Sequence, residues 1–196
     1  TEIILNRRWK WFIGFRDITN STNERTMILS IIPESAVGNS LPLIIPLDDK
    51  FDAALFISHY SSLPFDFIAR QKVSGTHINF FIINQFVTIP SQFYPLKIAA
   101  KIHSIFEKLA CTTSSLIDFS NQISSIEDYY PWDENLRFNL KCELDAIYAH
   151  LYDLTRDELD YILDTFPIIK RKEMEKYGRY RTKETILQLF DQKIWE

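Results

Sequence analysis

The sequence predicts an α+β fold in which a strand-rich first half, residues 1–95, packs against an all-helical second half, residues 96–196. Before residue 95, apolar and β-branched residues alternate or run in short blocks, which is typical of strands. After it, apolar residues recur every three or four positions, as in an amphipathic helix. Because each half is small and apolar, we expect one packed unit, excised from a larger chain that does not begin at Thr1.

Three strands are expected in the first half. Residues 9–15 alternate large apolar side chains with other residues, which predicts a strand with one strongly apolar face. Residues 26–33 are apolar at successive positions, which predicts a strand buried on both faces. The segment 41–46 contains two prolines, which cannot donate to a ladder, so we place it at a sheet edge. A polar loop, residues 16–25, joins the first two strands.

Helical signals begin after the third strand. Asp48 or Asp49 is expected to cap a helix that starts near Phe51. Pro64 then interrupts this helix, and a second short helical stretch covers residues 65–70.

A second polar loop, residues 72–77, leads into a segment with an ambiguous pattern. Residues 78–90 fit either one strand or a short helix followed by a strand. We favour the second arrangement, with residues 86–89 extended before Pro90.

The second half begins with a helix over residues 98–109, where Ile and Leu recur at steps of four, three and four. The Ser-rich stretch 111–131 is expected to be mostly irregular. Asp133 then caps a long helix whose apolar stripe comprises Leu136, Leu140, Leu144, Ile147, Leu151 and Leu154.

Two shorter helices complete the predicted fold. Thr155 and Glu158 have the spacing of a capping box and start a short helix that ends before Pro167. A basic loop follows, and Thr182 is expected to cap a last helix with Ile186, Phe190 and Ile194 on one side.

Charge is distributed unevenly along the chain, although the net charge is only −4. Residues 117–164 carry 12 acidic and 3 basic side chains, whereas residues 170–183 carry 7 basic and 2 acidic ones. The overall balance argues against nonspecific wrapping of nucleic acid. The basic segment is either a solvated helix end and loop or one face of a contact surface.

Motifs for catalysis and metal binding are absent from the sequence: there is no glycine-rich phosphate loop, zinc-protease motif or nucleophile elbow. The four histidines lie far apart and are more typical of structural positions than of ligands. Cys111 and Cys142 predict reduced thiols in a cytoplasmic protein. No apolar stretch is long enough to span a bilayer, so no membrane partner is expected. These observations alone support a soluble, noncatalytic α+β domain without a metal.

Two polar loops contrast with the apolar framework and supply the candidate binding residues. Their side chains are of the kinds that hydrogen-bond base edges and phosphates. The first loop contributes Arg16, Asn23 and Arg25. The second loop and the residues on either side of it contribute Arg70, Gln71, Lys72, Ser74, Gly75, Thr76, His77 and Asn79. The alternative is a pair of ordinary connecting loops, with Arg16 and Asp17 as a local ion pair.

These loops belong to stretches that resemble the C-terminal part of adenine-specific DNA methyltransferases of bacterial restriction–modification and phage-defence systems. The resemblance covers most of the chain and leaves out mainly residues 111–132. The matching stretches are WFIGFRDITNSTNERTMILSIIP, VGNSLPLII, LPFDFIARQKVSGTHINFFIINQFVTIP and DELDYILDTFPIIKRKEMEKYGRYRTKETILQLFD.

In that family this region follows the catalytic domain and looks like the target-recognition domain; some members also carry a fused nuclease. The resemblance implies binding of a defined duplex DNA sequence, so that the catalytic domain flips out and methylates an adenine at N6. The family's Asn/Asp-Pro-Pro-Tyr/Phe motif and its S-adenosylmethionine loop are missing here, so this chain is expected neither to bind that cofactor nor to transfer a methyl group. The family's glycine loop, short helix and apolar stretch match Ser74, Gly75, Thr76, Asn79 and Pro90.

Two main hypotheses follow. In the first, the chain is a DNA target-recognition domain whose polar loops contact DNA, and the acidic residues 117–164 face away from it. Its phosphate-positioning patch comprises Lys170, Arg171, Lys172, Arg179 and Arg181. In the second, the acidic helical half docks onto the methyltransferase or nuclease domain of the parent chain, or onto a separate subunit. Basic residues and polar loops gathered on one face favour DNA, and scattered ones favour docking. A free-standing small enzyme is a third hypothesis, for which no catalytic constellation is found.

Overall fold

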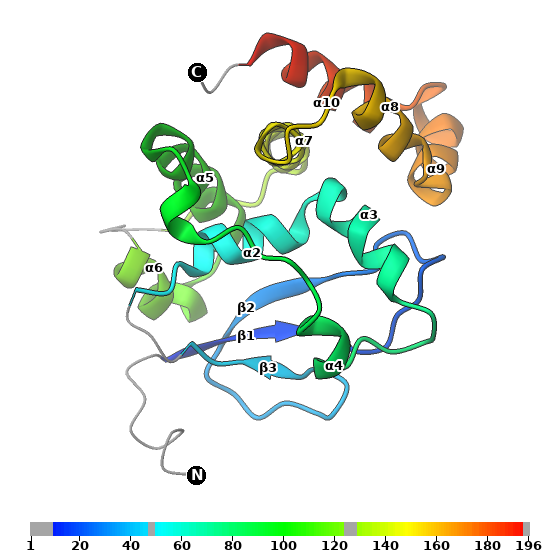
Figure 1. The fold of residues 1–196 in the computed structure, drawn as a ribbon. Helices are drawn as coiled ribbons and strands as arrows, with labels where there is room; N and C mark the ends of the chain where they lie inside the picture. The colour runs from blue at the N-terminus through cyan, green and yellow to red at the C-terminus, as the bar shows by residue number, and fades with distance from the viewer. Residues whose placement is uncertain (1–9, 47–49, 124–128, 194–196) are drawn as a thin grey trace.

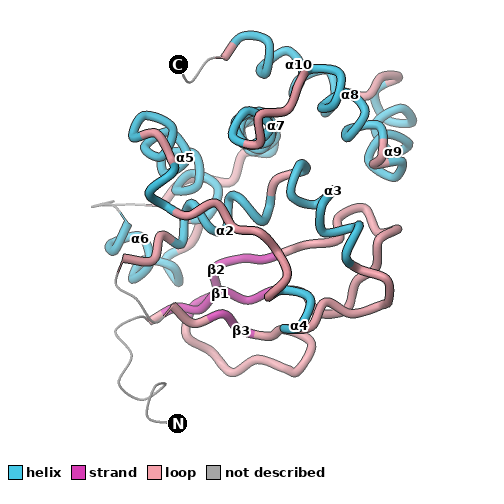
Figure 2. Tube along the Cα trace, viewed as in Figure 1, coloured by secondary structure: helices cyan, strands magenta, loops and turns pink. Residues whose placement is uncertain are grey.

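The computed structural model describes residues 10–46, 50–123 and 129–193. A small antiparallel sheet from the first half lies beneath a set of helices (Figure 1) that includes α5 (Leu96–Ala110), α7 (Glu134–Leu151), α8 (Arg156–Asp164), α9 (Pro167–Tyr177) and α10 (Arg181–Gln192) of the second half. The same view by secondary structure shows the strands confined to one end of the molecule and joined by long loops (Figure 2). The predicted α+β class is confirmed.

The sheet has the strand order β2-β1-β3, with β1 (Trp11–Phe15) between β2 (Leu29–Pro33) and β3 (Leu43–Ile44). Both pairings are antiparallel. The two-residue strand β3 lies at the edge, as its flanking prolines predict.

Burial of the two longer strands differs from the prediction. All five residues of β1 are buried, whereas β2 alternates between buried Leu29 and Ile31 and exposed Ser30. The two strands differ in burial because β1 is the central strand of the sheet and is covered on both faces. Leu41 packs so closely beneath Gly14 that a Cβ there would lie 3.1 Å from the Leu41 Cδ1.

Two consecutive helices, α2 (Ala53–Ser61) and α3 (Leu63–Lys72), follow the sheet. The predicted cap at Asp48 or Asp49 is wrong: both lie outside the described residues, and the Asp52 carboxylate accepts the Leu55 N–H at 2.9 Å. Pro64 lies in the first turn of α3. Backbone N–H groups there have no acceptor within the helix, so the absence of an N–H in proline costs no helical hydrogen bond. The second helix is therefore longer than predicted, and it places Gln71 and Lys72, like Arg70, on a helix rather than in a loop.

The segment after α3 contains the predicted short helix, α4 (Phe80–Ile83), but not the strand that was expected to follow it. Asn79 caps α4 by accepting the Ile82 N–H at 3.1 Å. Residues 86–90 are irregular, and a single 3₁₀ turn, η1 (Ser91–Phe93), leads into the second half.

Two of the three caps predicted for the helical half are confirmed. The Asp133 carboxylate accepts the Leu136 N–H at 2.8 Å, and Thr155 and Glu158 form the capping box. Its elements are α5 (Leu96–Ala110), η2 (Ser114–Leu116), α6 (Ile117–Ile123), α7 (Glu134–Leu151), α8 (Arg156–Asp164), α9 (Pro167–Tyr177) and α10 (Arg181–Gln192).

Three predictions for this half are wrong. The stretch 111–131 includes the helix α6, and the supposed basic loop is the helix α9. Thr182 does not cap α10; instead the Glu173 carboxylate accepts both its N–H, at 2.7 Å, and its hydroxyl, at 2.6 Å. Ile194 and Trp9 lie outside the described residues.

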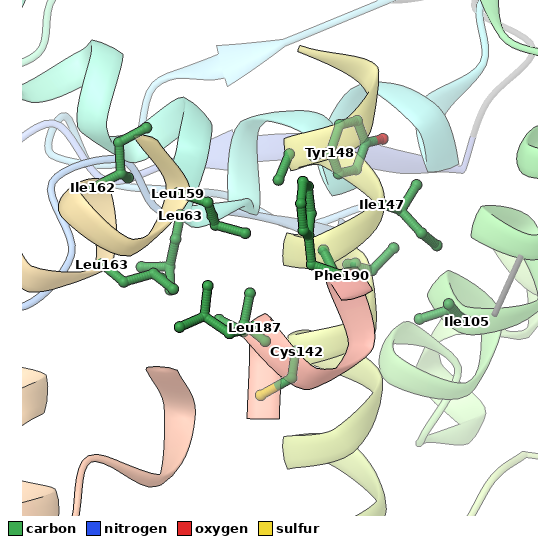
Figure 3. Packing of buried hydrophobic residues seen from close by; sticks show 14 of the residues in the cluster. Leu63, Ile105, Cys142, Ile147, Tyr148, Leu159, Ile162, Leu163, Leu187 and Phe190 are labelled. Atoms are coloured by element: carbon green, nitrogen blue, oxygen red, sulfur yellow. The ribbon is translucent and has the colours of Figure 1, made fainter. Parts of the chain in front are cut away.

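Buried apolar residues form two clusters that share the helices α2 and α3. One cluster surrounds the sheet, and the other surrounds α7 with side chains from α5, α8 and α10 (Figure 3). Leu55 of α2 and Leu63 of α3 belong to the helical cluster, whereas Ala54 and Phe65 belong to the sheet cluster. Helices that precede residue 95 thus contribute to the core of the second half.

The turn between α9 and α10 depends on Gly178, whose φ of +69° lies in the left-handed region that disfavours a Cβ. We expect Gly178→Ala to lower the free energy of unfolding by about 1 kcal/mol. Gly38→Ala is the matched control, because Gly38 is exposed with no atom within 4 Å of an added Cβ. Urea unfolding of both variants tests this; equal midpoints would contradict it.

A candidate nucleic-acid interface

The two predicted polar loops lie side by side at one edge of the molecule, beyond the end of α3 (Figures 1 and 2). The Thr19 N–H donates to the Thr76 carbonyl at 3.0 Å, and the Ile78 N–H donates to the Asp17 carbonyl at 2.8 Å. The His77 Nδ1 lies 3.0 Å from a carboxylate oxygen of Asp17. Segments about 60 residues apart in the sequence are thereby joined by backbone hydrogen bonds.

Arg70 connects this edge to the helical half. Its guanidinium donates to the carbonyls of Asn23 at 2.7 Å and Glu24 at 3.0 Å in the first loop. It also donates to the Thr165 carbonyl at the end of α8, at 3.0 Å, and lies 4.1 Å from the centre of the Phe166 ring. Only 9% of the side chain is exposed. Arg70, predicted as a DNA contact, therefore binds the protein itself.

The carboxylate of Asp66 completes this buried network. It is fully buried and accepts the Arg70 Nε–H at 3.1 Å. It also accepts the backbone N–H groups of Thr26 at 3.0 Å and Met27 at 2.7 Å, where the chain enters β2. The Arg25 Nε lies 3.8 Å away. One carboxylate therefore holds α3 against the start of a strand 40 residues earlier.

Two further predicted contacts stabilise the first loop internally. The Arg16 guanidinium donates to the Thr19 hydroxyl at 2.9 Å and to the Arg25 carbonyl at 2.7 Å. The Asn23 amide donates to the same hydroxyl at 3.2 Å. These donors already bind acceptors within the loop. The prediction that Arg16 and Asn23 contact DNA is therefore not supported by their geometry. Asn79 is similarly engaged as the cap of α4.

The remaining predicted residues of the second loop and the helix before it are exposed: Gln71, Lys72, Ser74, Gly75, Thr76 and His77. The basic helix α9 adjoins them, because Lys172 forms an ion pair with Glu24 of the first loop. Of the cations on this edge, Lys72 and Arg171 form no ion pair with any described residue. Because no described carboxylate pairs with them, they keep their positive charge for a phosphate.

Acidic residues neutralise part of the basic segment. Lys170 pairs with Asp164 at 3.0 Å, and Lys183 pairs with both Asp164 and Asp160 at 2.8 Å. Hydrogen bonds from Lys183 and Lys170 lower the pKa of Asp164. These carboxylates of α8 lie beside the basic segment that was predicted to meet phosphates, whereas residues 117–164 were expected to face away from DNA.

The two other cations of the predicted patch also have partners within the protein. Arg179 pairs with Glu184 at 3.2 Å, and the Arg181 guanidinium lies 3.8 Å from the centre of the Phe138 ring. The phosphate-facing patch is consequently smaller than the sequence predicted.

A cavity of about 340 Å³ begins at the end of the first polar loop and lies between β2 and the helices α2, α5 and α7. Arg25, Arg137, Lys141 and Asp145 line it together with Ser58. Arg25, predicted as a DNA contact, therefore belongs to the cavity wall. Sequence reasoning missed this site, although Arg137, Lys141 and Asp145 follow one another at steps of four and so share a helix face.

Comparisons with known proteins give no relative. A scan against family models, a search of curated proteins and a search of solved structures each returned no match.

Other features bear on the classes of partner considered above. None of the helices in the described ranges is long and apolar enough to cross a membrane. The described part of the chain contains no group of three His, Cys, Asp or Glu side chains placed to hold a metal ion. Cys111 and Cys142 are buried free thiols, and burial raises the pKa of each.

Replacing Arg70 tests its structural role. We expect Arg70→Met to lower the free energy of unfolding by about 3 kcal/mol, because the buried Asp66 carboxylate would lose its closer cation and keep only Arg25, whose Nε lies 3.8 Å away. Lys72→Met, two residues later but exposed, should change it by less than about 0.5 kcal/mol. Denaturant unfolding measures both, and similar values for the two variants would contradict this role.

Asp145 gives a pH-dependent prediction. Burial raises its pKa from 3.8 to about 6, so the folded state holds a proton that the unfolded state has released between these values. Its ionisation therefore costs stability progressively as the pH rises from about 4 to 6. In Asp145→Asn, the new amide oxygen would keep accepting the Leu63 N–H without titrating. The stability of Asp145→Asn relative to wild type should rise by about 3 kcal/mol across this range. A pH-independent difference would contradict it.

Proposed function

We propose that the chain is a target-recognition domain that binds duplex DNA for an adenine-N6 methyltransferase of a restriction–modification or phage-defence system. The observation that supports this function best is the meeting of both polar loops and the basic helix α9 at one edge. Basic residues and polar loops gathered on one face were expected for DNA binding, and scattered ones for docking.

At the edge where the two polar loops meet, buried residues fix the loops and exposed residues are left to contact DNA. The network of Asp66 and Arg70 is buried and fixes the loops, so that their exposed side chains are presented from a rigid base. Gln71, Ser74 and Thr76 offer hydrogen-bond donors and acceptors of the kind that read base edges. Lys72 and Arg171, which have no ion-pair partner among the described residues, supply positive charge for the phosphates on either side.

The methyl transfer itself belongs to a catalytic domain that is not in this chain. That domain would bind S-adenosylmethionine and receive the flipped adenine, while this chain selects the site on DNA. Accordingly, the proposal assigns no cofactor and no catalytic residue to the 196 residues.

One observation favours the second hypothesis, docking onto the methyltransferase domain. Large apolar side chains are exposed along the segment from α4 to the start of α5, where Phe81 is 76% and Leu96 is 90% exposed. Val87 and Phe93 lie between them and are also exposed. Exposed apolar side chains of this size mark protein contacts more often than DNA contacts. Docking through this segment leaves the polar edge free, so both functions are compatible.

Substitutions of Lys72 and Arg171 test the DNA-binding proposal. We expect the isolated chain to bind random-sequence duplex DNA with an affinity that falls as salt rises. Lys72→Met combined with Arg171→Met should weaken this binding and reduce the slope of log affinity against log salt by about 2, one unit for each lost phosphate contact.

The control is Lys97→Met combined with Lys108→Met on α5, which removes the same charge away from the edge. An equal loss in the control would show that net charge rather than this edge governs binding. Failure of the wild-type chain to bind DNA at low salt would contradict autonomous DNA binding and leave docking as the function.

A further inference from the structure

We propose that the cavity between β2, α2, α5 and α7 is a binding site for a small phosphate monoester with an apolar body. The cavity shares only Arg25 with the residues predicted to contact DNA, so the proposal does not depend on the DNA-binding function. It rests on uncompensated positive charge, a buried hydroxyl without a partner among the described residues, and an apolar wall.

The cavity contains more positive than negative charge. Arg25, Arg137 and Lys141 face a single carboxylate, Asp145, because the nearby Asp66 is shared between Arg25 and Arg70. Neither Arg137 nor Lys141 forms an ion pair with a described residue; the Arg137 guanidinium donates to the Leu109 carbonyl at 2.7 Å and lies 3.8 Å from the centre of the Trp132 ring, contacts that do not neutralise its charge. The charges of Arg137 and Arg25 also help to lower the pKa of Lys141, after its own desolvation. An excess of two positive charges complements a phosphate monoester dianion.

A buried polar atom in the wall has no hydrogen-bond partner among the described residues. Ser58 of α2 is 1% exposed, and within the described part of the chain its hydroxyl forms no hydrogen bond. The Arg25 Nε is also buried without a hydrogen-bond acceptor there. Such groups are costly to leave unsatisfied. In the free protein both atoms are covered, and an anionic ligand with oxygen acceptors would bond them once the Ser58 and Arg25 side chains turn toward the cavity that they line.

The rest of the wall is apolar and limits the size of the ligand. It comprises side chains from β2, α5 and α7 that include Leu29, Phe106 and Leu144. The volume of about 340 Å³ is at the lower end of small-molecule sites. Lys141 is exposed, so the cationic side of the cavity is open to solvent. A ligand would therefore place its phosphate at this side and its apolar body against the wall.

Phenyl phosphate is a suitable probe, with inorganic phosphate and phenol as its two halves. We expect calorimetry to show saturable binding of phenyl phosphate to the full chain, weaker binding of inorganic phosphate, and none of phenol. Lys141→Met should weaken phenyl phosphate binding at least tenfold, because it removes a cation that no described carboxylate pairs with. Ser58→Ala should weaken it about tenfold without loss of stability, because the hydroxyl bonds to no described residue in the free protein.

Lys97→Met is the matched control, since it removes an exposed lysine of α5 outside the cavity and should leave binding unchanged. Thermal unfolding of each variant shows whether it is folded. A duplex without terminal phosphates should not compete with phenyl phosphate, which separates this site from the DNA edge. Absence of binding at about 1 mM phenyl phosphate, or equal weakening by Lys141→Met and Lys97→Met, would overturn the proposal.

Discussion

The buried ion pair between Asp66 and Arg70 is the constraint on which the rest of the structure depends. Through Asp66 it fixes the entry into β2, and through Arg70 it fixes the first polar loop and the junction between α8 and α9. A buried charge is tolerated only when its partner and its remaining hydrogen bonds are in place. The network therefore permits few alternative placements of these segments, and it makes the polar edge a rigid surface.

The junction of α2 and α3 contains a second set of buried polar groups, where the two apolar clusters meet. Asp145 of α7 accepts the Leu63 N–H at 2.6 Å and so satisfies the start of α3. The Tyr148 hydroxyl donates to the Leu55 carbonyl at 3.0 Å, and His59 lies 2.6 Å from the Tyr152 hydroxyl. Burial lowers the pKa of His59 to about 4, so the ring is neutral at pH 7. These contacts align α7 with the sheet half.

The polar edge and the cavity result from the same distribution of charge. Internal partners occupy most of the cations that the sequence offers, among them Arg16, Arg70 and Lys170. Among the cations without an ion pair to a described residue, Lys72 and Arg171 lie on α3 and α9, and Arg137 and Lys141 line the cavity, whereas Lys97 and Lys108 lie on α5 away from both sites. The net charge of −4 does not indicate either site, because the local electrostatic potential depends on which charges the fold brings close together.

The sequence by itself determined the elements whose signals are local. The Asp133 cap, the Thr155 capping box and the short edge strand β3 each depend on residues within a few positions of one another. The tertiary structure decided which polar residues are free, because their partners are distant in the sequence. Asp66 lies four residues before Arg70, so this ion pair is a local signal that Lys72 lacks, but the acceptors 46, 47 and 95 residues away that bury Arg70 have no local signal. The cavity likewise exists only where four separate elements meet, so its charge and its buried Ser58 hydroxyl became visible only in the folded chain.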